Sequence, residues 1–489
     1  MSSKNQAVGY LPDERPPFLE LILFALQQIV VMFPATVLVA LLTGFHVSTT
    51  IFASGFATLC FILVTGRKIP LYYGSSFSYI AAISSIMGAK QFAELTPDAR
   101  ISIAQFGIVM SGLVSIAAGL IIQRFGRKLI DRVLPPTITG SIAIIIGLSL
   151  AASALTDASS YSSPASVVVN VEDHKEDDVS NVNVGGVIAN SNNIFSETEV
   201  SDAKTYSDYS WVIALITLFS TIIYSVYLKG KLSQLPILFG LLTGYISAAV
   251  LGLITGIEFI SFTKSGLSGI VNLPTFTLPK PSLAAVAAIM PIAIATIPES
   301  TAHVFQLDIY VNDYAKKKGS KKRYNIADKL GLNLIGDGIG DIVSGFIGGP
   351  AGTNYGENIS TMAISKVFSI PVLIVAAVIT MIISCFTPLI NAVYSIPQGV
   401  IGGLSIYLFG VIAAQGIAIM MESKVDLFNS KNLSIIAIIL IIGLGGSFGF
   451  ANGMIPLFGV KFPAIASAAV VGIVLNLLLS IGNRKEENA

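Results

Sequence analysis

Charged residues are scarce in this chain of 489 amino acids. They make up 12% of it, against roughly 25% in an ordinary soluble domain, while 53% of its residues are hydrophobic. A chain of this composition cannot cover a folded core with a water-facing surface, which excludes a soluble globular protein. The formal net charge of +1 gives no signal for nucleic-acid binding, and nucleic acid is not an expected partner.

Cysteine and histidine are also rare. The two cysteines, Cys60 and Cys385, both lie in apolar stretches, so a disulfide or metal framework is not expected and both are interpreted as small buried hydrophobic residues. The chain has no His-Glu-x-x-His motif, no Gly-x-Ser-x-Gly motif and no pairing of a nucleophile with a base. We therefore expect neither an enzyme nor a bound metal or cofactor.

Long apolar runs are what the chain has in abundance. A run of about 20 apolar residues is long enough to cross a lipid bilayer as a helix. By this criterion the sequence predicts an all-α membrane protein with fourteen spans. They lie near residues 17–43, 48–66, 69–88, 101–122, 134–155, 209–228, 233–255, 284–308, 326–348, 353–368, 369–392, 398–421, 431–450 and 462–482.

Lysine and arginine are concentrated in alternate loops between these spans. By the positive-inside rule this pattern predicts a multi-pass protein of the cell (plasma) inner membrane with both termini in the cytoplasm. The acidic loop 156–208, rich in Ser and Asn, then lies outside. The basic positions are Arg67 and Lys68; Arg124, Arg127, Lys128 and Arg132; Lys229 and Lys231; Lys316, Lys317, Lys318, Lys321, Lys322 and Arg323; Lys424; and Arg484 and Lys485.

Two of the predicted spans are short and contain glycine. The third includes residues 73–77, and the tenth includes residues 355–358, which end the glycine-rich run 348–358 and contain the acid Glu357. Broken helices at membrane depth persist only where they line a cavity or are buried in protein, and a carboxylate there marks a substrate or ion site by default. Seven spans separate the two segments, which predicts a seven-plus-seven inverted repeat and a transporter.

A second acid, Glu299, lies in another proline-interrupted apolar stretch. With Glu357 it can accept hydrogen bonds from the N–H groups of a small planar polar ligand, and a carboxyl group can also carry a proton. His303 follows Glu299 by four residues and so shares its helical face. Either a Glu–His proton relay or a purely structural histidine fits this spacing.

Three further sets of polar residues are candidates for the same site. Asp337 and Asp341 are also four residues apart and could bind a cation such as Na⁺, or could bond the broken backbone of a neighbouring helix; a structural role is favoured for Asp341. In the third span, an extended backbone around Ser76 and Phe77 would point N–H groups into a cavity. Phe77 would then offer its ring to a flat ligand, and the alternative is an ordinary lipid-facing aromatic residue.

Several motifs resemble those of the nucleobase–ascorbate transporter family, in particular its bacterial uracil and xanthine permeases. The resemblance extends from about residue 14 to residue 480, interrupted by the acidic loop. The motifs are Arg15-Pro16-Pro17, Met32-Phe33-Pro34-Ala35-Thr36-Val37-Leu38-Val39, Ile69-Pro70-Leu71-Tyr72-Tyr73-Gly74-Ser75-Ser76-Phe77, Leu134-Pro135-Pro136, Asn354-Tyr355-Gly356-Glu357-Asn358-Ile359-Ser360-Thr361-Met362-Ala363-Ile364-Ser365-Lys366, Gly402-Gly403-Leu404-Ser405 and Glu422-Ser423-Lys424-Val425-Asp426.

The resemblance implies a domain organisation and an assembly. It implies short antiparallel strands in the third and tenth spans, an elevator-like movement of a core domain against a gate domain, and a homodimer in the lipid bilayer. The implied parts are a cytoplasmic tail, 1–16; the core domain, 17–133 and 284–397; the gate domain, 134–155 with 209–283 and 398–482; the external loop, 156–208; and a second cytoplasmic tail, 483–489.

Residue roles also follow from the resemblance. Glu299 and Glu357 are implied to grip a nucleobase and, with His303, to couple its import to a proton. The implied lining of the base site is Phe77, Ser76, Gly356, Tyr355 and Ala35, whereas Asp337, Asp341, Asn358 and Ser405 are candidates for an ion site or a structural role.

The chain departs from the pattern of the family at positions that bear on the substrate. The start Glu299-Ser300-Thr301 resembles xanthine permeases, which usually have Asp where His303 stands, and Gln28 replaces a typical His. The favoured function is proton-coupled import of uracil. The alternatives are a permease for the purines xanthine, guanine or hypoxanthine, and an anion carrier on the same fold. Na⁺ in place of H⁺ stays open because of Asp337 and Asp341.

Overall fold

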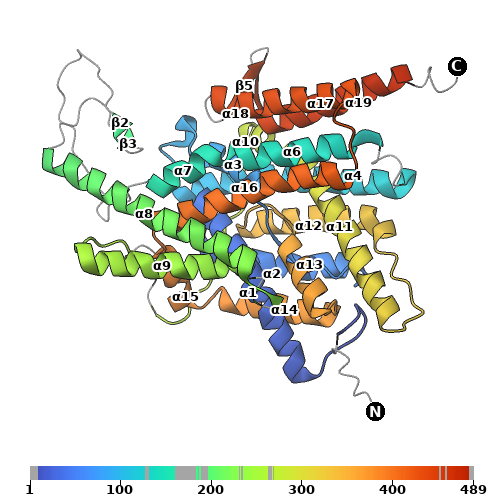
Figure 1. Cartoon of the computed structure of the whole chain (residues 1–489), viewed down its shortest axis with the longest axis horizontal. Coiled ribbons are helices and arrows are strands. Elements are labelled where there is room, and N and C mark those ends of the chain that lie inside the picture. The colour runs from blue at the N-terminus through green and yellow to red at the C-terminus, as the bar shows by residue number, and fades with distance from the viewer. Residues whose placement is uncertain are drawn as a thin grey trace. The chain divides into compact units, whose positions relative to one another are not determined.

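The computed structural model is mostly helical, with a few very short strands (Figure 1). It describes residues 9–126, 132–159, 183–184, 187–188, 197–230, 232, 235–262, 267, 269–450, 453–457 and 460–483. The chain divides into two compact units. Unit 1 comprises 1–149, 267–390 and 411–489, and unit 2 comprises 150–266 and 391–410.

Unit 1 begins with two long helices and a broken segment. The first helix, α1, ends where Gly44 takes a left-handed conformation with φ 74°, as helix C-termini commonly do. Thr96 caps the start of α4 by accepting a hydrogen bond from the Ala99 N–H group. The elements are α1 (Phe18–Thr43), α2 (Val47–Val64), β1 (Tyr73–Ser75), α3 (Ile80–Met87), α4 (Pro97–Phe125) and α6 (Pro136–Ser149).

The second part of unit 1 repeats this plan. The span predicted near 284–308 is divided at Met290 and Pro291, because proline has no N–H group to continue the helical bonding. The elements are α10 (Leu283–Ile289), α11 (Ile292–Lys317), α12 (Leu330–Ile347), β4 (Gly352–Asn354), α13 (Gly356–Ser365) and α14 (Ile370–Ile383). In Figure 1 they run from yellow to orange, and α11 contacts both α12 and α13.

The C-terminal part of unit 1 contains a helix with an unusual turn. Five residues, Ile441–Gly445, form a π-helical turn between α17 and α18. In Figure 1 the helices α17 and α19 lie side by side in red. The elements are α17 (Ser430–Leu440), α18 (Gly446–Gly449), β5 (Met454–Leu457), β6 (Val460–Pro463) and α19 (Ala464–Asn483); β5 and β6 pair as an antiparallel hairpin.

Unit 2 is built mainly from α8 and α9, which pack against each other. Its elements are α7 (Ala151–Ser159), β2 (Asn183–Val184), β3 (Val187–Ile188), α8 (Glu197–Tyr227), α9 (Pro236–Thr255), the second half of α15 (Thr387–Tyr394) and the first half of α16 (Gln398–Glu422). Helices α7 and α8 extend into both ends of the predicted loop 156–208, and β2 pairs with β3 inside it. Its other residues lie outside the described part of the chain.

In the described part of the chain, ten helices are long and apolar enough to cross a membrane. Three of the other predicted spans appear as shorter apolar helices, at Phe77–Met87, Ile370–Ile383 and Ala464–Ser480. The tenth predicted span contains only the ten-residue α13. The structure therefore bears out a multi-pass helical protein, and the count of fourteen spans stays a prediction.

Large apolar side chains also lie on the surface of these helices. Phe18 is 74% exposed, Val226 67% and Leu253 88%. Exposure of this kind is unfavourable in water but suits helices that face lipid. The surface therefore agrees with the hydropathy of the sequence.

Close packing of α4 against α12 places the acids of α12 inside unit 1. A Cβ atom added at Gly112 would lie 2.4 Å from the carbonyl oxygen of Gly338, so the two backbones are in direct contact. Small residues at such interfaces allow helices in a membrane to approach closely. As a result Asp337 and Asp341, on α12, are buried.

Candidate functional site

Two short buried strands pair inside unit 1, and their pairing is called the strand crossing below. The strands β1 and β4 pair antiparallel, with Gly74 opposite Thr353 and Ser75 opposite Gly352. A Cβ atom at Gly352 would lie 2.3 Å from the Tyr73 ring and 2.6 Å from the Gly74 carbonyl oxygen, so only glycine fits. This pairing confirms the predicted short strands in the third and tenth segments.

Each strand leads directly into a helix, so two helix N-termini meet near the crossing. After β1, the side chain of Ser76 accepts a hydrogen bond of 3.3 Å from the Ser78 N–H group, and a 3₁₀ turn starts at Phe77. The extended backbone predicted through Phe77 therefore ends one residue earlier, because this cap begins the turn. After β4, α13 starts at Gly356 with Glu357 in its first turn, where a negative charge is favourable. The shared order of strand then helix fits an inverted repeat.

The two acids singled out in the sequence come together beside this crossing. The Ser78 hydroxyl group donates a hydrogen bond of 3.3 Å to Glu299 on α11. The carboxyl groups of Glu299 and Glu357 also interact electrostatically. Both side chains keep partial exposure. Acids from segments 58 positions apart thus face one region, with like charges placed to repel each other unless a proton or a ligand intervenes.

His303 and Phe77 lie close to these acids. A Cβ atom at Gly356 would be 2.9 Å from Nε2 of His303, so the ring rests against the start of α13. The Nδ1 atom of His303 is buried without a hydrogen-bond partner among the described residues. Phe77 is partly buried against the core of unit 1, which excludes a purely lipid-facing position. No hydrogen bond joins His303 to Glu299 in the described part, so a Glu–His relay stays a prediction.

Tyr355 connects the crossing to the first helix. Its hydroxyl group donates to the Ser75 carbonyl oxygen at 3.1 Å and lies 2.9 Å from the Thr36 hydroxyl oxygen of α1. Ala35, next to Thr36, is 2% exposed and belongs to the same core. Tyr355 therefore joins β1 to α1, and Ala35 lies next to its partner Thr36 in the chain.

Asp337 is the centre of a buried polar network. It accepts hydrogen bonds from Ser300, from Asn333 at 3.1 Å and from Asn354 at 2.8 Å. Ser300 directly follows Glu299, and Asn354 is the last residue of β4. The network thus joins α11, α12 and β4. Its Asn354 Oδ1 atom is buried without a partner among the described residues.

Asp341 has different partners from Asp337. One of its oxygens accepts a hydrogen bond of 2.5 Å from the Tyr73 hydroxyl group and one of 2.8 Å from the Gly352 N–H group. Asp341 therefore holds both strands of the crossing, which supports the structural role favoured for it. Among the described residues, the two acids of α12 have no hydrogen-bond partner in common.

Asn358 and Ser405 have separate surroundings. Asn358 donates to Gln28 of α1, to its backbone oxygen at 3.0 Å and to its side-chain oxygen at 2.8 Å. Gln28, which stands where the family typically has His, thus accepts hydrogen bonds from Asn358. Ser405 lies on α16 in unit 2, whereas the other candidates lie in unit 1. Its hydroxyl group is buried without a partner among the described residues.

Sequence reasoning did not assign roles to several residues of this region. Ser78, Thr36, Ser300, Asn333 and Asn354 all contact a candidate residue. Their only sequence signal is a small polar side chain in an apolar segment. Ser and Asn also pack ordinary membrane helices, so that signal does not separate site residues from packing residues.

The arrangement combines acceptors and donors for a small polar molecule. Two carboxyl groups accept hydrogen bonds when ionised, and the backbone N–H groups at the starts of two helices donate them. Among the described residues, no group of three or more His, Cys, Asp or Glu could hold a metal ion.

Solved structures with the same fold are membrane transport proteins. The chain superimposes on solute carrier 26 family member A9 with a TM-score of 0.61 at 12% identity, covering 95% of this chain and 65% of that one. It matches the transmembrane domain of the cyanobacterial bicarbonate transporter BicA with a TM-score of 0.55 at 14% identity, covering 96% and 99%. The fold is thus that of multi-pass transporters with inverted repeats.

Sequence comparison specifies the family. The model described as "Permease family", that of the xanthine/uracil permeases, matches residues 19–175 and 186–452, and the chain belongs to this family. It is 32% identical to the uracil permease of Bacillus caldolyticus, over 97% of this chain and 96% of that one. It is also 32% identical to the uracil permease of Bacillus subtilis (strain 168), over 100% and 98%. The protein is therefore a member of a family of membrane transporters.

Proposed function

We propose that this protein is a secondary active transporter that imports a nucleobase, with uracil as the favoured substrate, by proton symport. The observation that carries the proposal is the meeting of Glu299 and Glu357 beside two helix N-termini. The full-length similarity to uracil permeases supports the choice of substrate.

A nucleobase has the chemistry that such a site would recognise. Uracil is flat and carries ring N–H groups and carbonyl oxygens. The carboxyl groups of Glu299 and Glu357 would accept hydrogen bonds from the N–H groups, and backbone N–H groups near Phe77 and Gly356 would donate to the carbonyl oxygens. The ring of Phe77 would cover a face of the base.

Proton coupling follows from placing two carboxyl groups at one site. Two ionised acids repel each other, so a proton on one of them favours a compact, occupied site. His303, with its unpartnered Nδ1 atom, is a second group that could hold this proton. Release of the proton on the cytoplasmic side would weaken the grip on the base. Na⁺ at the Asp337 network is the alternative coupling ion.

Two rival substrates use the same fold. A purine such as xanthine also offers N–H groups to the acids, and the Glu299-Ser300-Thr301 start fits this rival. An anion is disfavoured because the two carboxylates would repel it, although two helix N-termini alone would attract it.

The transport cycle and topology belong to the same proposal. A core domain that includes the strand crossing would move against a gate domain, as an elevator, in a homodimer within the plasma membrane. Both termini would face the cytoplasm, since alternate loops carry the basic clusters.

Thermal stabilisation of the purified protein tests the substrate directly. A ligand that binds only the folded state must raise the melting temperature. The panel is uracil, thymine, xanthine, hypoxanthine, guanine and ascorbate. A shift with uracil and none with xanthine supports the pyrimidine assignment, and the reverse makes the protein a purine permease. Stabilisation by none of the compounds would refute nucleobase transport.

A further inference from the structure

The segment before the first helix is bonded like an added strand to the loop that follows α13. We name residues 9–14 the N-terminal strap. Tyr10 donates from its N–H group to the Lys366 carbonyl oxygen at 2.9 Å, and its own carbonyl oxygen accepts from the Phe368 N–H group at 2.7 Å. The Ile370 N–H group donates to Pro12 at 3.1 Å. These backbone bonds anchor the strap to residues 366–370, between α13 and α14.

Close packing fixes the start of the strap. A Cβ atom added at Gly9 would lie 2.3 Å from the Tyr314 hydroxyl oxygen and 2.6 Å from the Lys366 carbonyl oxygen. No other residue type therefore fits at this position. Leu11 is 4% exposed and belongs to the core of unit 1. The strap is a packed part of the fold.

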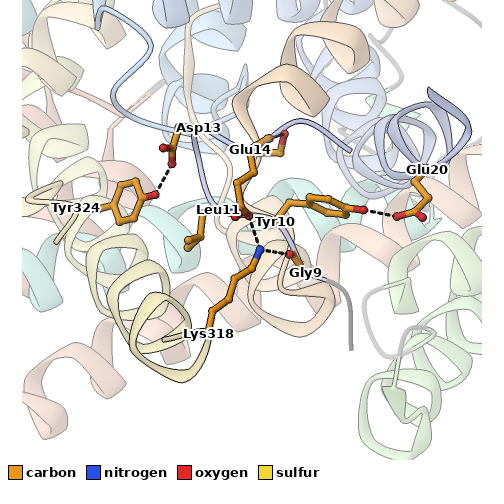
Figure 2. Close-up of polar contacts among 9 residues, drawn as sticks. Gly9, Tyr10, Leu11, Asp13, Glu14, Glu20, Lys318 and Tyr324 are labelled. Atoms are coloured by element: carbon orange, nitrogen blue, oxygen red, sulfur yellow. Dashed lines mark hydrogen bonds and ion pairs between the residues drawn. The ribbon is translucent and has the colours of Figure 1, made fainter. Parts of the chain in front are cut away.

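Side chains connect the strap to two further helices, as Figure 2 shows. Lys318, which follows α11, donates to the Gly9 carbonyl oxygen at 2.9 Å and to Glu14 at 2.6 Å. The Tyr10 hydroxyl group donates to Glu20 of α1 at 2.7 Å.

A second contact lies further along the loop after α11. Asp13 accepts hydrogen bonds from Tyr324 and from Lys322, the latter at 2.9 Å. These ion pairs are partly exposed and contribute little individually. The backbone hydrogen bonds and the packing at Gly9 therefore contribute most of the stabilisation of the bound strap.

The strap joins three helices, and the same three helices carry or contact the residues of the candidate site. Helix α11 holds Glu299 and His303, α13 holds Glu357, and α1 contacts Tyr355 through Thr36. Helix α13 has only ten residues and Glu357 lies in its first turn. A displacement of the C-terminal end of this short helix therefore also displaces Glu357. The strap bonds both to the loop after that end, at Lys366, and to Lys318 after α11.

We propose that the N-terminal strap is a permanent brace that keeps α11 and α13, and hence Glu299 and Glu357, in fixed register. Its effect on substrate affinity rests on the proposed function, whereas the bracing itself does not. Gly9 and Lys318 are then positioning residues that touch no substrate.

Cysteine accessibility tests the brace without any substrate. Ser369 is 1% exposed and donates to the Glu14 carbonyl oxygen at 2.6 Å. In a Cys60→Ser, Cys385→Ser background, Ser369→Cys should react slowly with a maleimide. Adding Gly9→Val or Lys318→Met should speed labelling about tenfold or more, as the bound state of the strap becomes less populated. Fast labelling with the natural strap would overturn the proposal.

Lys317→Met is the matched control. Lys317 pairs with Asp313 of its own helix at 2.6 Å and does not touch the strap. This variant removes the same charge at the neighbouring position and should leave labelling unchanged. If Lys317→Met and Lys318→Met increased the labelling rate equally, the loss of one positive charge would explain the effect, and the brace would be refuted.

The affinity for uracil tests the consequence for the site. Gly9→Val and Lys318→Met should raise the Kd for uracil about tenfold, with Lys317→Met at the value of the natural chain. Unchanged affinity in a rapidly labelled variant would refute the positioning role. If the natural chain binds no base while Ser369→Cys stays protected, the proposed function fails and the brace stands.

A reversible disulfide separates a brace from a gate. Residues 10 and 367 face each other in a parallel bridge, so Tyr10→Cys with Val367→Cys should form a disulfide. For a permanent brace, uptake should be equal in the oxidised and reduced forms of this one protein. Loss of uptake on oxidation, restored by reductant, would show that the strap must open, which would overturn the proposal.

Discussion

The hydroxyl group of Tyr73 donates a hydrogen bond of 2.5 Å to Asp341, although 268 positions separate the two residues. The same carboxylate oxygen accepts from the Gly352 N–H group at 2.8 Å. One buried acid on α12 thus holds both strands of the crossing, and through them both broken segments.

Removing this acid should destabilise the strand crossing. Asp341→Ala leaves two buried donors without an acceptor, which costs about 1–3 kcal/mol for each donor. Asp341→Asn keeps an oxygen for both and should lose less. Thermal melting in detergent measures both variants, and an alanine variant as stable as the asparagine variant would contradict this account.

Adding a methyl group at the crossing should separate the strands. Gly352→Ala places a Cβ atom 2.3 Å from the Tyr73 ring, so we expect a loss of stability of at least about 1–3 kcal/mol and loss of base binding. Gly410→Ala is the control, because nothing lies within 4 Å of its added Cβ atom. Melting curves that are the same for the two variants would refute the crowding argument.

Glu357→Gln should abolish uptake of the base. Glutamine keeps the shape but cannot ionise, and the lost charged hydrogen bond amounts to about 1.5–3 kcal/mol, or roughly a 10- to 150-fold lower affinity. Radiolabelled uptake and ligand-induced melting shifts measure the change, with the exposed Glu94→Gln as the control. Near-normal transport by Glu357→Gln would remove this acid from the mechanism.

The contact between Thr36 and Tyr355 should show energetic coupling. Thr36→Val leaves the Tyr355 hydroxyl group its bond to Ser75, so its effect should be about 0.5–1.5 kcal/mol. Tyr355→Phe should cost more, because Ser75 then loses its donor. The stability loss of the double variant should be smaller than the sum of the losses of the two single variants, because each single variant already removes the bond between the two hydroxyl groups. Strict additivity would mean that the two hydroxyl groups act independently.

The strap should be insensitive to pH near neutrality. Burial works against ionisation of Asp13, but hydrogen bonds from Tyr324 and Lys322 outweigh it and lower the pKa below its ordinary value of 3.8. Burial and the hydrogen bond to Glu20 raise the pKa of Tyr10 to about 12.

The sign of each shift defines the pH range. The lowered pKa of Asp13 gives stability that is present above the ordinary value and is lost as pH falls through the folded value. The raised pKa of Tyr10 gives stability that is lost only as pH rises above about 10. The melting temperature difference between the natural chain and Asp13→Asn should therefore be constant from about pH 5 to 9 and shrink toward pH 3. A difference that changes near pH 7 would contradict these ionisation states.

Local patterns in the sequence were sufficient for the class of protein and for the principal acids. Hydropathy is a property of neighbouring residues, so spans, breaks and the intramembrane acids Glu299 and Glu357 can be read without a fold. The family motifs then indicated paired strands, which the register of β1 with β4 confirms.

Contacts between distant segments required the tertiary structure. Asp337 and Asp341 look equivalent in the sequence, yet Asp337 bonds Ser300, Asn333 and Asn354, whereas Asp341 bonds Tyr73 and Gly352. Residues four apart on a helix share a face. Their hydrogen-bond partners, however, depend on which neighbouring segment packs against the helix at each of the two positions.

The N-terminal strap illustrates the same limit. Residues 9–14 read as a polar tail before the first span, because neither hydropathy nor periodicity marks them. Only the folded chain brings Gly9 against Tyr314, more than 300 positions away, where glycine alone leaves room for the backbones to meet. The sequence by itself determined a transporter with two acids at its broken helices, and the tertiary structure decided what holds those helices in register, because that depends on contacts that no local pattern encodes.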